Sequence, residues 1–313
     1  EEFPDLPMHQ LPAYDVQYDH DNMIRAMAGQ LPRIARAIQQ ENKATQHLIN
    51  RYHFRGIISD NRYGVRSKHV PSVIICHQVN IRVPNSVLQS VVRIGHRRSL
   101  AAFDAIWVPD FADAPGLSGE LGHDLKLKNV QYLGPLSRFS SGGSKGKETR
   151  KILAILSGPE PQRGYLEKLI TKQLLDLPVT ALIVCGNTHE NKVENLNERV
   201  KRISYLTADA LQQAIQESEF IICRSGYSSL MDLYALGKKA LLIPTPGQTE
   251  QAYLAKIFGE KPGYIYQDQV DCHLPKGITA LEKENDPKQP NTSQWQQQQE
   301  RILHDWLASL FVI

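Results

Sequence analysis

Short apolar runs alternate with longer amphipathic stretches along most of the sequence. Runs of this length that are rich in Val and Ile are typical of parallel strands covered on both faces. The strands that we predict are 56–59, 72–76, 105–108, 130–133, 152–156, 181–185, 203–206, 220–223, 240–243 and 264–266. Helical periodicity predicts helices at 32–52, 86–103, 163–175, 208–217, 228–236 and 248–258. This alternation predicts an α/β fold of βαβ units with open, doubly wound sheets.

A stretch rich in Ser, Gly and Lys at 140–147 separates two sets of predicted strands. This composition is typical of a flexible linker. We therefore expect a first domain at 1–139, a linker at 140–150 and a second domain at 151–293. The remaining amphipathic segment, 294–313, is expected to be a helix that docks on the first domain rather than a membrane anchor.

The composition is that of an ordinary soluble protein, with 41% hydrophobic and 22% charged residues among 313. A net charge of +3 does not indicate a nucleic-acid partner, and we predict none. No apolar run approaches the length of about 18 residues that a membrane-spanning helix needs. Cys76, Cys185 and Cys223 each end an apolar run, which predicts buried free thiols in a cytoplasmic protein.

The most informative segment follows the predicted strand 220–223. The turn 224–226 leads into a helix that begins at Ser228 or Ser229, so its N–H groups and dipole favour an anion. Gly226 allows a ligand to approach the backbone closely. Asp232, one turn further on, is placed to accept hydrogen bonds from ribose hydroxyls. The alternative is an ordinary strand–turn–helix with a Ser cap.

Similar polar loops follow three other predicted strands, at 157–163, 186–188 and 244–251. Ligands of open α/β sheets bind at the carboxyl ends of strands, so these loops are expected to share one ligand site. Arg163 supplies a guanidinium suited to phosphate oxygens. The predicted site residues are Gly158, Gln162, Arg163, Arg224, Ser225, Gly226, Ser228, Ser229, Asp232, Gln248, Thr249, Glu250 and Gln251.

The turn 224–226, Asp232 and the Pro-rich turn ending in Gln251 resemble the donor-binding half of MurG-type glycosyltransferases (family 28, GT-B fold). The resemblance covers roughly 150–260. Shorter phrases in the first half resemble uncharacterised bacterial relatives of that family, at 59–64, 77–78, 104–110 and 133–139. The resemblance implies two Rossmann-like domains facing a cleft, with a nucleotide sugar bound to the second domain. The family transfers N-acetylglucosamine from UDP-GlcNAc to a lipid-linked acceptor.

The resemblance also implies roles for single residues. Ser225 and Gly226 match the phosphate-contacting turn. With Arg163 and Ser228 they are expected to hold the diphosphate. Asp232 replaces a Glu that contacts the ribose. Gln251 matches the first of two adjacent glutamines that recognise the sugar, whereas Ala252 replaces the second. Glu250 and Gln251 would therefore read the sugar.

One departure from the family concerns the start of the chain. The family opens with a strand and a Gly-rich loop that contains a Gly-His pair, and no such motif precedes Asp60. The chain begins at Glu1 rather than Met, so we expect that the first βα unit is missing from it. The alternative is that the protein has lost that step.

Inverting transfer needs a base that takes the proton of the acceptor hydroxyl. Asp60 and His77 each follow a predicted strand of the first half and are the catalytic candidates; alternatively, they are ordinary loop residues. The sequence 19–21 matches the metal-binding string DxD but is more simply read as a helix N-cap at Asp21. We predict no metal and no cofactor, with the UDP-sugar as co-substrate and leaving-group charge offset by Arg163, Arg224 and helix N-termini.

The stretch 85–103 is amphipathic and basic. A face with these charges could lie on an anionic membrane, which would suit a lipid-linked acceptor. The alternative is a packed helix with a solvated charged end. Its basic residues are Arg93, His96, Arg97 and Arg98.

Together these patterns predict a cytoplasmic hexosyltransferase, peripheral to the inner face of the membrane. It would move a hexosyl or N-acetylhexosaminyl unit from a UDP-sugar to an acceptor. Two alternatives remain open: a UDP-sugar epimerase or hydrolase on the same fold, and a non-catalytic subunit that binds the nucleotide sugar.

Overall fold

The computed structural model describes residues 5–12, 23–81, 86–123, 127–139, 149–188, 190–288 and 290–311. The chain forms two compact units. Unit 1 comprises 1–112, 120–133 and 299–313, and unit 2 comprises 113–119 and 134–298. The chain therefore passes into unit 2 after 133 rather than after 139. Residues 140–148 of the predicted linker lie outside the described residues.

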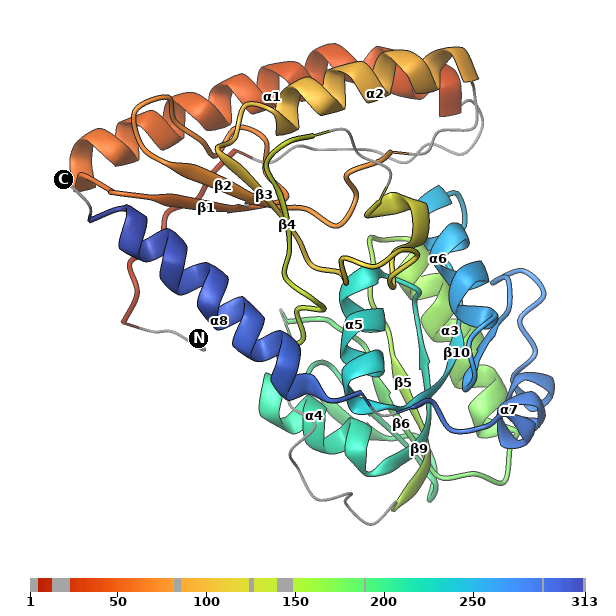
Figure 1. The fold of residues 1–313 in the computed structure, drawn as a ribbon. Helices are drawn as coiled ribbons and strands as arrows, with labels where there is room; N and C mark the ends of the chain where they lie inside the picture. The colour runs from red at the N-terminus through yellow and green to blue at the C-terminus, as the bar shows by residue number, and fades with distance from the viewer. Residues whose placement is uncertain are drawn as a thin grey trace. The chain divides into compact units, whose positions relative to one another are not determined.

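Unit 1 is built on four parallel strands that lie side by side in chain order. These are β1 (Ile57–Asp60), β2 (Ser72–Ile75), β3 (Ala105–Val108) and β4 (Val130–Tyr132). Figure 1 shows the helices α1 (Met23–Tyr52) and α2 (Ser86–Leu100) on one face of this sheet. A short 3-10 helix, η1, spans Gly119–Leu121.

The two faces of this sheet bury different side chains because successive strand residues alternate in direction. Ile106 faces a core cluster that includes Leu100 of α2. Trp107, on the opposite face, meets Trp306 of helix α8 (Thr292–Ser309) edge to face, with ring centroids 5.7 Å apart. A Cβ on Gly56 would lie only 2.7 Å from the Trp306 ring. The last turns of α8 therefore dock on the sheet of unit 1.

Unit 2 contains a seven-stranded sheet with the order β11-β10-β9-β5-β6-β8-β7, in which only the β7–β8 pair is antiparallel. The chain starts at β5, moves outward through β6 and β8, and returns to β9 on the other side of β5. This reversal defines a doubly wound sheet and places its switch point between β5 and β9. The strands are β5 (Arg150–Ile155), β6 (Ala181–Val184), β7 (Val193–Asn195), β8 (Val200–Ile203), β9 (Ser218–Cys223), β10 (Lys239–Leu242) and β11 (Tyr264–Tyr266).

Helices cover both faces of this second sheet (Figure 1). Leu166, Ile170 and Leu174 of α3 pack in one core cluster with Leu274 and Ile278 of α7. Each such fully buried side chain contributes roughly 1.5–3 kcal/mol. The opposite face is covered by α4 and α5. The helices are α3 (Gln162–Leu175), α4 (Ala208–Gln216), α5 (Tyr227–Leu236), α6 (Thr249–Gly259) and α7 (Leu274–Lys283).

One predicted strand is displaced, and three elements, including the 3-10 helix η1, escaped prediction. The strand expected at 203–206 lies at Val200–Ile203, because the charged side chains of Lys201 and Arg202 hide it from a search for apolar runs. The short strand β7 and the helix α7 were not predicted. The α/β fold and the doubly wound sheet of unit 2 are confirmed.

Candidate functional site

Four polar loops of unit 2 leave the same edge of its sheet. They follow β10, β9, β5 and β6, which are consecutive neighbours and run parallel, so their carboxyl ends lie side by side. The switch point between β5 and β9 falls in the middle of this group. Open α/β sheets bind ligands at this position.

Arg224 joins three of these loops from inside the protein. Its side chain is 1% exposed, and Nη1 donates to the carbonyls of Ile243 (3.2 Å) and Pro244 (3.1 Å). Nη2 donates to the carbonyl of Gln162 at 2.9 Å. Burial lowers the pKa of the guanidinium to about 10. Arg224 therefore fixes the loops through its Nη atoms. Its role in the donor site stays a prediction.

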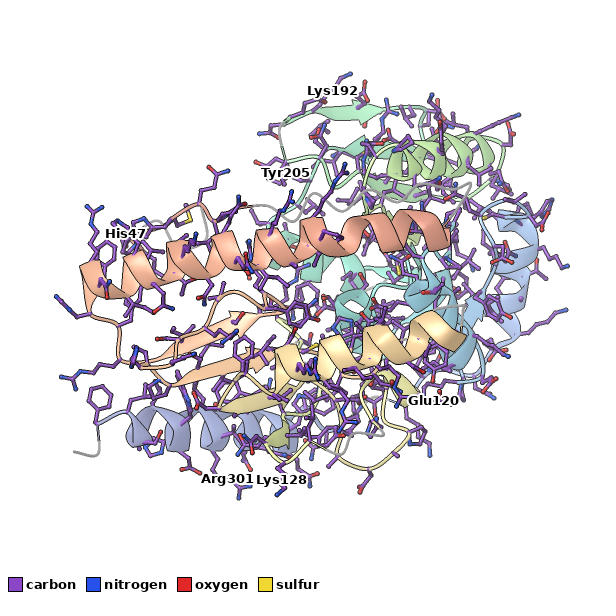
Figure 2. All side chains as sticks on the ribbon, turned by 90° about the horizontal axis from the view of Figure 1, so that it is seen from above. His47, Glu120, Lys128, Lys192, Tyr205 and Arg301 are labelled. Atoms are coloured by element: carbon purple, nitrogen blue, oxygen red, sulfur yellow. The ribbon has the colours of Figure 1, made fainter. Side chains whose placement is uncertain are left out.

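Arg163 is likewise occupied within unit 2. Its guanidinium pairs with Glu160 and with Glu167, the latter at 2.7 Å, and Nη1 also donates to the carbonyl of Cys185 at 3.2 Å. Glu167 also binds Arg202 at 3.1 Å. These side chains line a polar hollow of about 250 Å³ at the ends of β6 and β8. Figure 2 labels Lys192, which lies on the same hollow. The phosphate role of Arg163 stays a prediction.

The N-terminus of α5 is open. Gly226 is the N-cap residue, and no side chain caps the helix. A Cβ on Gly226 would meet no atom within 4 Å. The helix dipole favours an anion at this end of α5. Ser228 is exposed and Ser229 half-buried in this turn, so neither provides the ordinary Ser cap considered above.

Ser225 and Gln251 connect the loops after β9 and β10. The Ser225 hydroxyl is fully buried and donates to the carbonyl of Gln251 at 2.8 Å. The Gln251 Oε1 atom accepts from the N–H of Thr245, also at 2.8 Å. The hydroxyl of Ser225 therefore points inward, which leaves its backbone as the part available to a phosphate. Recognition of a sugar by Gln251 stays a prediction.

Asp232 contacts two residues that sequence reasoning missed. Its carboxylate accepts a hydrogen bond from the Ser137 hydroxyl at 2.8 Å and lies 3.6 Å from Nε of Arg138. Desolvation raises the pKa of Asp232, against hydrogen bonds from both residues and the charge of Arg138. Only the 133–139 phrase hinted at these residues, and it assigned them no role.

The loops after β5 and β10 meet at Gly158 and Thr245. Gly158 has φ +107°, a conformation that glycine adopts readily, and the Thr245 Oγ1 atom would lie 3.8 Å from a Cβ there. Thr245 was not predicted. The Gln162 Oε1 atom accepts from Gln269 Nε2 at 3.2 Å, which ties the loop to the segment after β11. Gln248 is the N-cap of α6, and Thr249 and Glu250 form the first turn of this helix.

The loop after β1 in unit 1 is held by α1. The buried carboxylate of Glu41 accepts from Arg62 Nε and, at 2.8 Å, from the N–H of Gly64. Asn42 Nδ2 donates to the carbonyls of Gly64 (2.9 Å) and Arg66 (2.8 Å). Side chains of α1 therefore hold both a backbone N–H group and backbone carbonyl groups of this loop.

The two catalytic candidates lie at neighbouring strand ends of unit 1. Asp60 ends β1 with its side chain exposed and is in register with Ile75 of β2. His77 follows β2 and is half-buried. The pairing of β1 with β2 thus brings Asp60 and His77 to the same edge, whereas their catalytic roles stay predictions.

Helix α2 presents a smaller basic face than predicted. His96 is buried, lies 3.0 Å from the Tyr63 hydroxyl through Nε2, and has its pKa lowered to about 4 by burial. It therefore points into unit 1 as a neutral ring. Ile94 is 54% exposed and lies among basic residues that are also exposed, namely Arg93, Arg97 and Arg98.

Two further sequence predictions concern membranes and metals. Within the described ranges, no helix has the length and apolar character needed to cross a bilayer. The same ranges hold no cluster of three His, Cys, Asp or Glu side chains suited to a metal ion, and the string at 19–21 lies outside them.

Comparison with known proteins finds a match to a family model in the second half of the chain. Residues 163–305 match the family model "Glycosyltransferase family 28 C-terminal domain". This match covers somewhat less than half of the chain. The family 28 resemblance inferred from 224–251 is therefore confirmed.

Individual relatives are distant. A UDP-N-acetylglucosamine–N-acetylmuramyl-(pentapeptide) pyrophosphoryl-undecaprenol N-acetylglucosamine transferase of Lacticaseibacillus casei is 26% identical over 115 residues, 34% of this chain and 31% of that protein. An uncharacterized glycosyltransferase of Methanosarcina acetivorans is 22% identical over 233 residues, 66% of this chain and 58% of that protein. The chain thus spans about a third to three fifths of the length of these relatives.

The solved structures support the fold class. The crystal structure of a glycotransferase of kitacinnamycin superposes with a TM-score of 0.61 at 12% identity, covering 96% of this chain and 86% of that one. Similarity at this identity concerns the fold alone. The predicted GT-B-like α/β fold class is confirmed.

Proposed function

We propose that this protein is a hexosyltransferase. In this proposal it binds a UDP-sugar at the carboxyl edge of the unit 2 sheet and passes the hexosyl or N-acetylhexosaminyl unit to an acceptor hydroxyl. The observation that carries the proposal is the family 28 match over 163–305, which contains the open N-terminus of α5 at the switch point.

Binding of the diphosphate would depend mainly on backbone groups. The N-cap residue Gly226 has no side chain, and the space around it allows phosphate oxygens to approach the N-terminus of α5. Gly158 offers a second stretch of backbone without a side chain in the way. Arg224 would act indirectly, by holding the loops at fixed spacing. Asp232 would accept a hydrogen bond from the ribose, while Glu250 and Gln251 would contact the sugar.

The chemistry proposed is a single displacement with inversion. The acceptor oxygen attacks the anomeric carbon, the bond from that carbon to the β-phosphate oxygen breaks, and UDP leaves. A base takes the acceptor proton, and Asp60 or His77 would serve. The N-terminus of α5 stabilises the negative charge that develops on the leaving diphosphate. No step in this scheme requires a metal or a cofactor.

The acceptor is proposed to be lipid-linked and presented at the cytoplasmic face of a membrane. The Lacticaseibacillus relative is described by its name as acting on an undecaprenol-linked substrate. In this chain the exposed face of α2 combines Ile94 with Arg93, Arg97 and Arg98, a combination that suits anionic lipid headgroups.

Isothermal titration with UDP and UDP-GlcNAc tests donor binding directly. Wild-type protein should bind both, and Asp232→Ala should weaken binding because a ribose contact is lost. Glu198→Ala, an exposed acidic residue elsewhere in unit 2, serves as the matched control. If wild-type protein binds neither nucleotide, the proposal fails. Analysis of UDP-GlcNAc incubated without acceptor separates transfer from epimerisation or hydrolysis, because a transferase should leave the donor intact.

A further inference from the structure

The sheet of unit 2 has a groove on one of its faces, of about 260 Å³ and lined mainly by residues of β6 and β8. Ile152 and Ala154 of β5 belong to the core cluster of α3 and α7, so Leu153 between them points to the opposite face, the one that α4 covers. Leu182 of β6 is the register partner of Leu153 and points the same way. Leu153 is fully buried, whereas Leu182 is only half-buried. The helical cover of this face therefore ends between β5 and β6.

The groove combines an apolar floor with a cationic rim. Lys201 is the register partner of Leu182, and Arg199 immediately precedes β8. Both side chains are exposed, and neither forms an ion pair within the part of the chain that the structure describes. A third cation of the rim, Arg150, is the first residue of β5. The half-buried apolar side chains of the groove are Leu182, Ile203 and Leu206.

Helix α4 shows how this face of the sheet binds a helix. Its apolar side chains Leu211, Ala214 and Ile215 are buried. At its C-terminal end, Arg150 Nη1 donates to the carbonyl of Ala214 at 3.0 Å and Nη2 pairs with the Glu217 carboxylate at 2.9 Å. An arginine at the amino end of the strands thus binds the end of the helix where the dipole is negative.

The neighbouring strand β8 offers the same chemistry without a helix upon it. Arg199 and Lys201 lie toward the amino ends of the strands, as Arg150 does. A helix that lay beside α4 in the same direction would pack apolar side chains on Leu182 and Ile203. Its C-terminal carboxylates would then lie beside the two unpaired cations. The groove therefore suits a helix with an apolar stripe and acidic residues in its last turn.

We propose that this groove is a docking surface for an acidic amphipathic helix of a partner protein. The partner helix extends the layer that α4 begins and neutralises Arg199 and Lys201. The groove lies on a face of the sheet rather than among the loops at its carboxyl edge, so this inference does not depend on the proposed function.

A fluorescein-labelled peptide with the sequence of residues 207–219 serves as the probe. This peptide contains α4, with its apolar stripe, and two acidic residues that follow the helix. Fluorescence anisotropy should show saturable binding to the wild-type protein. A second peptide, in which Asp209, Glu217 and Glu219 are replaced by Asn, Gln and Gln, should bind about fivefold more weakly because ion pairs with the rim are lost.

Reversal of the two charges on the rim provides the test from the side of the protein. The double variant Arg199→Glu, Lys201→Glu should bind the acidic peptide about tenfold more weakly, because repulsion replaces attraction. The double variant Lys168→Glu, Lys172→Glu is the matched control. It changes the net charge equally at exposed positions of α3, on the other face of the sheet, and should bind the peptide as wild type does.

The remaining outcomes overturn the inference. Absence of saturable binding, or equal affinities for the two peptides, would show that the groove does not select an acidic helix. Unchanged binding to the Arg199→Glu, Lys201→Glu variant would place the peptide elsewhere. If sedimentation shows a wild-type dimer that this variant converts to a monomer, the occupant is a second copy of the chain. If the variant instead abolishes binding to phosphatidylglycerol vesicles, the occupant is a lipid surface.

Discussion

Each sheet has a buried charged side chain beside the loops at its carboxyl edge, and the two charges have opposite signs. In unit 1 the carboxylate of Glu41 accepts from the Gly64 N–H and from Arg62. In unit 2 the guanidinium of Arg224 donates to the carbonyls of Gln162, Ile243 and Pro244. Both residues replace water as the partner of loop backbone that would otherwise be buried without hydrogen bonds.

The sign of the buried charge decides which polar groups remain at the edge. Arg224 hydrogen-bonds backbone carbonyls at the edge of unit 2. The partial positive charge at the N-terminus of α5 is then the main local charge there, and it favours anions. Glu41 accepts a hydrogen bond from the Gly64 N–H and neutralises the charge of Arg62. Both contacts make the edge of unit 1 less attractive to anions. The catalytic candidates Asp60 and His77 lie at this edge.

The largest effect is expected for Arg224→Met. This substitution leaves three buried carbonyls without a donor and should lower the free energy of unfolding by about 4 kcal/mol. Urea denaturation would measure it, with Arg199→Met as the exposed control. A loss under about 1 kcal/mol would mean that the loops do not depend on Arg224.

Glu41→Gln should have a somewhat smaller effect. The amide retains one acceptor oxygen but directs an NH2 group at donors, and Arg62 loses its counter-charge, so a loss of about 3 kcal/mol is expected. The same denaturation experiment applies. Glu300→Gln, at an exposed position of α8, should change stability little. Equal free energies of unfolding for Glu41→Gln and Glu300→Gln would show that Glu41, unlike Arg224, is not needed to hold its loop.

His96 provides a test of unit 1 by pH. Its pKa is lowered to about 4 in the folded protein, below the ordinary value of 6.5, because burial disfavours the imidazolium. The unfolded chain therefore binds the proton more readily, and stability is full above pH 6.5 and falls as the pH drops toward 4. Between pH 7 and pH 5 the wild type should lose about 2 kcal/mol more than His96→Gln. Parallel stability curves for the two proteins would contradict a buried neutral His96.

The smallest effect on stability is expected for Gly226→Ala. A Cβ there meets no atom within 4 Å, and φ is −69°, so the free energy of unfolding should change by less than about 0.5 kcal/mol. Titration with UDP should nevertheless show weaker binding, because the methyl group occupies the approach to the N–H groups of α5. Unchanged UDP affinity would place the anion elsewhere.

Much of the fold follows from local sequence. Residues 105–108 and 264–266 were predicted with the bounds that the structure shows, because each is a short apolar run between turn residues. Strand β8 was displaced because Arg202 lies within it, paired with Glu194 at 2.8 Å. A search for apolar runs does not detect a strand whose charged residue is paired with a residue of another strand.

The candidate site was predictable in position but not in its contacts. Parallel strands bring their carboxyl ends together, so the four loops could be grouped from sequence. The hydrogen-bond partners of Arg163 and Arg224 could not be predicted from sequence, because a guanidinium donates equally well to a phosphate, a carboxylate or a carbonyl. Ser137 and Asp232 are 95 residues apart, and neither carries a local signal for the other.

Helix α8 has a consequence for how the protein is made. Its first turns belong to unit 2, and its remainder completes unit 1, where Trp306 meets Trp107 and fills the space beside Gly56. During synthesis the last residue of unit 2 is added before residues 299–311. Unit 1, although its strands are translated first, therefore finishes second. Until then the Trp107 face of its sheet is uncovered, and a nascent chain stalled before α8 would present that face to chaperones.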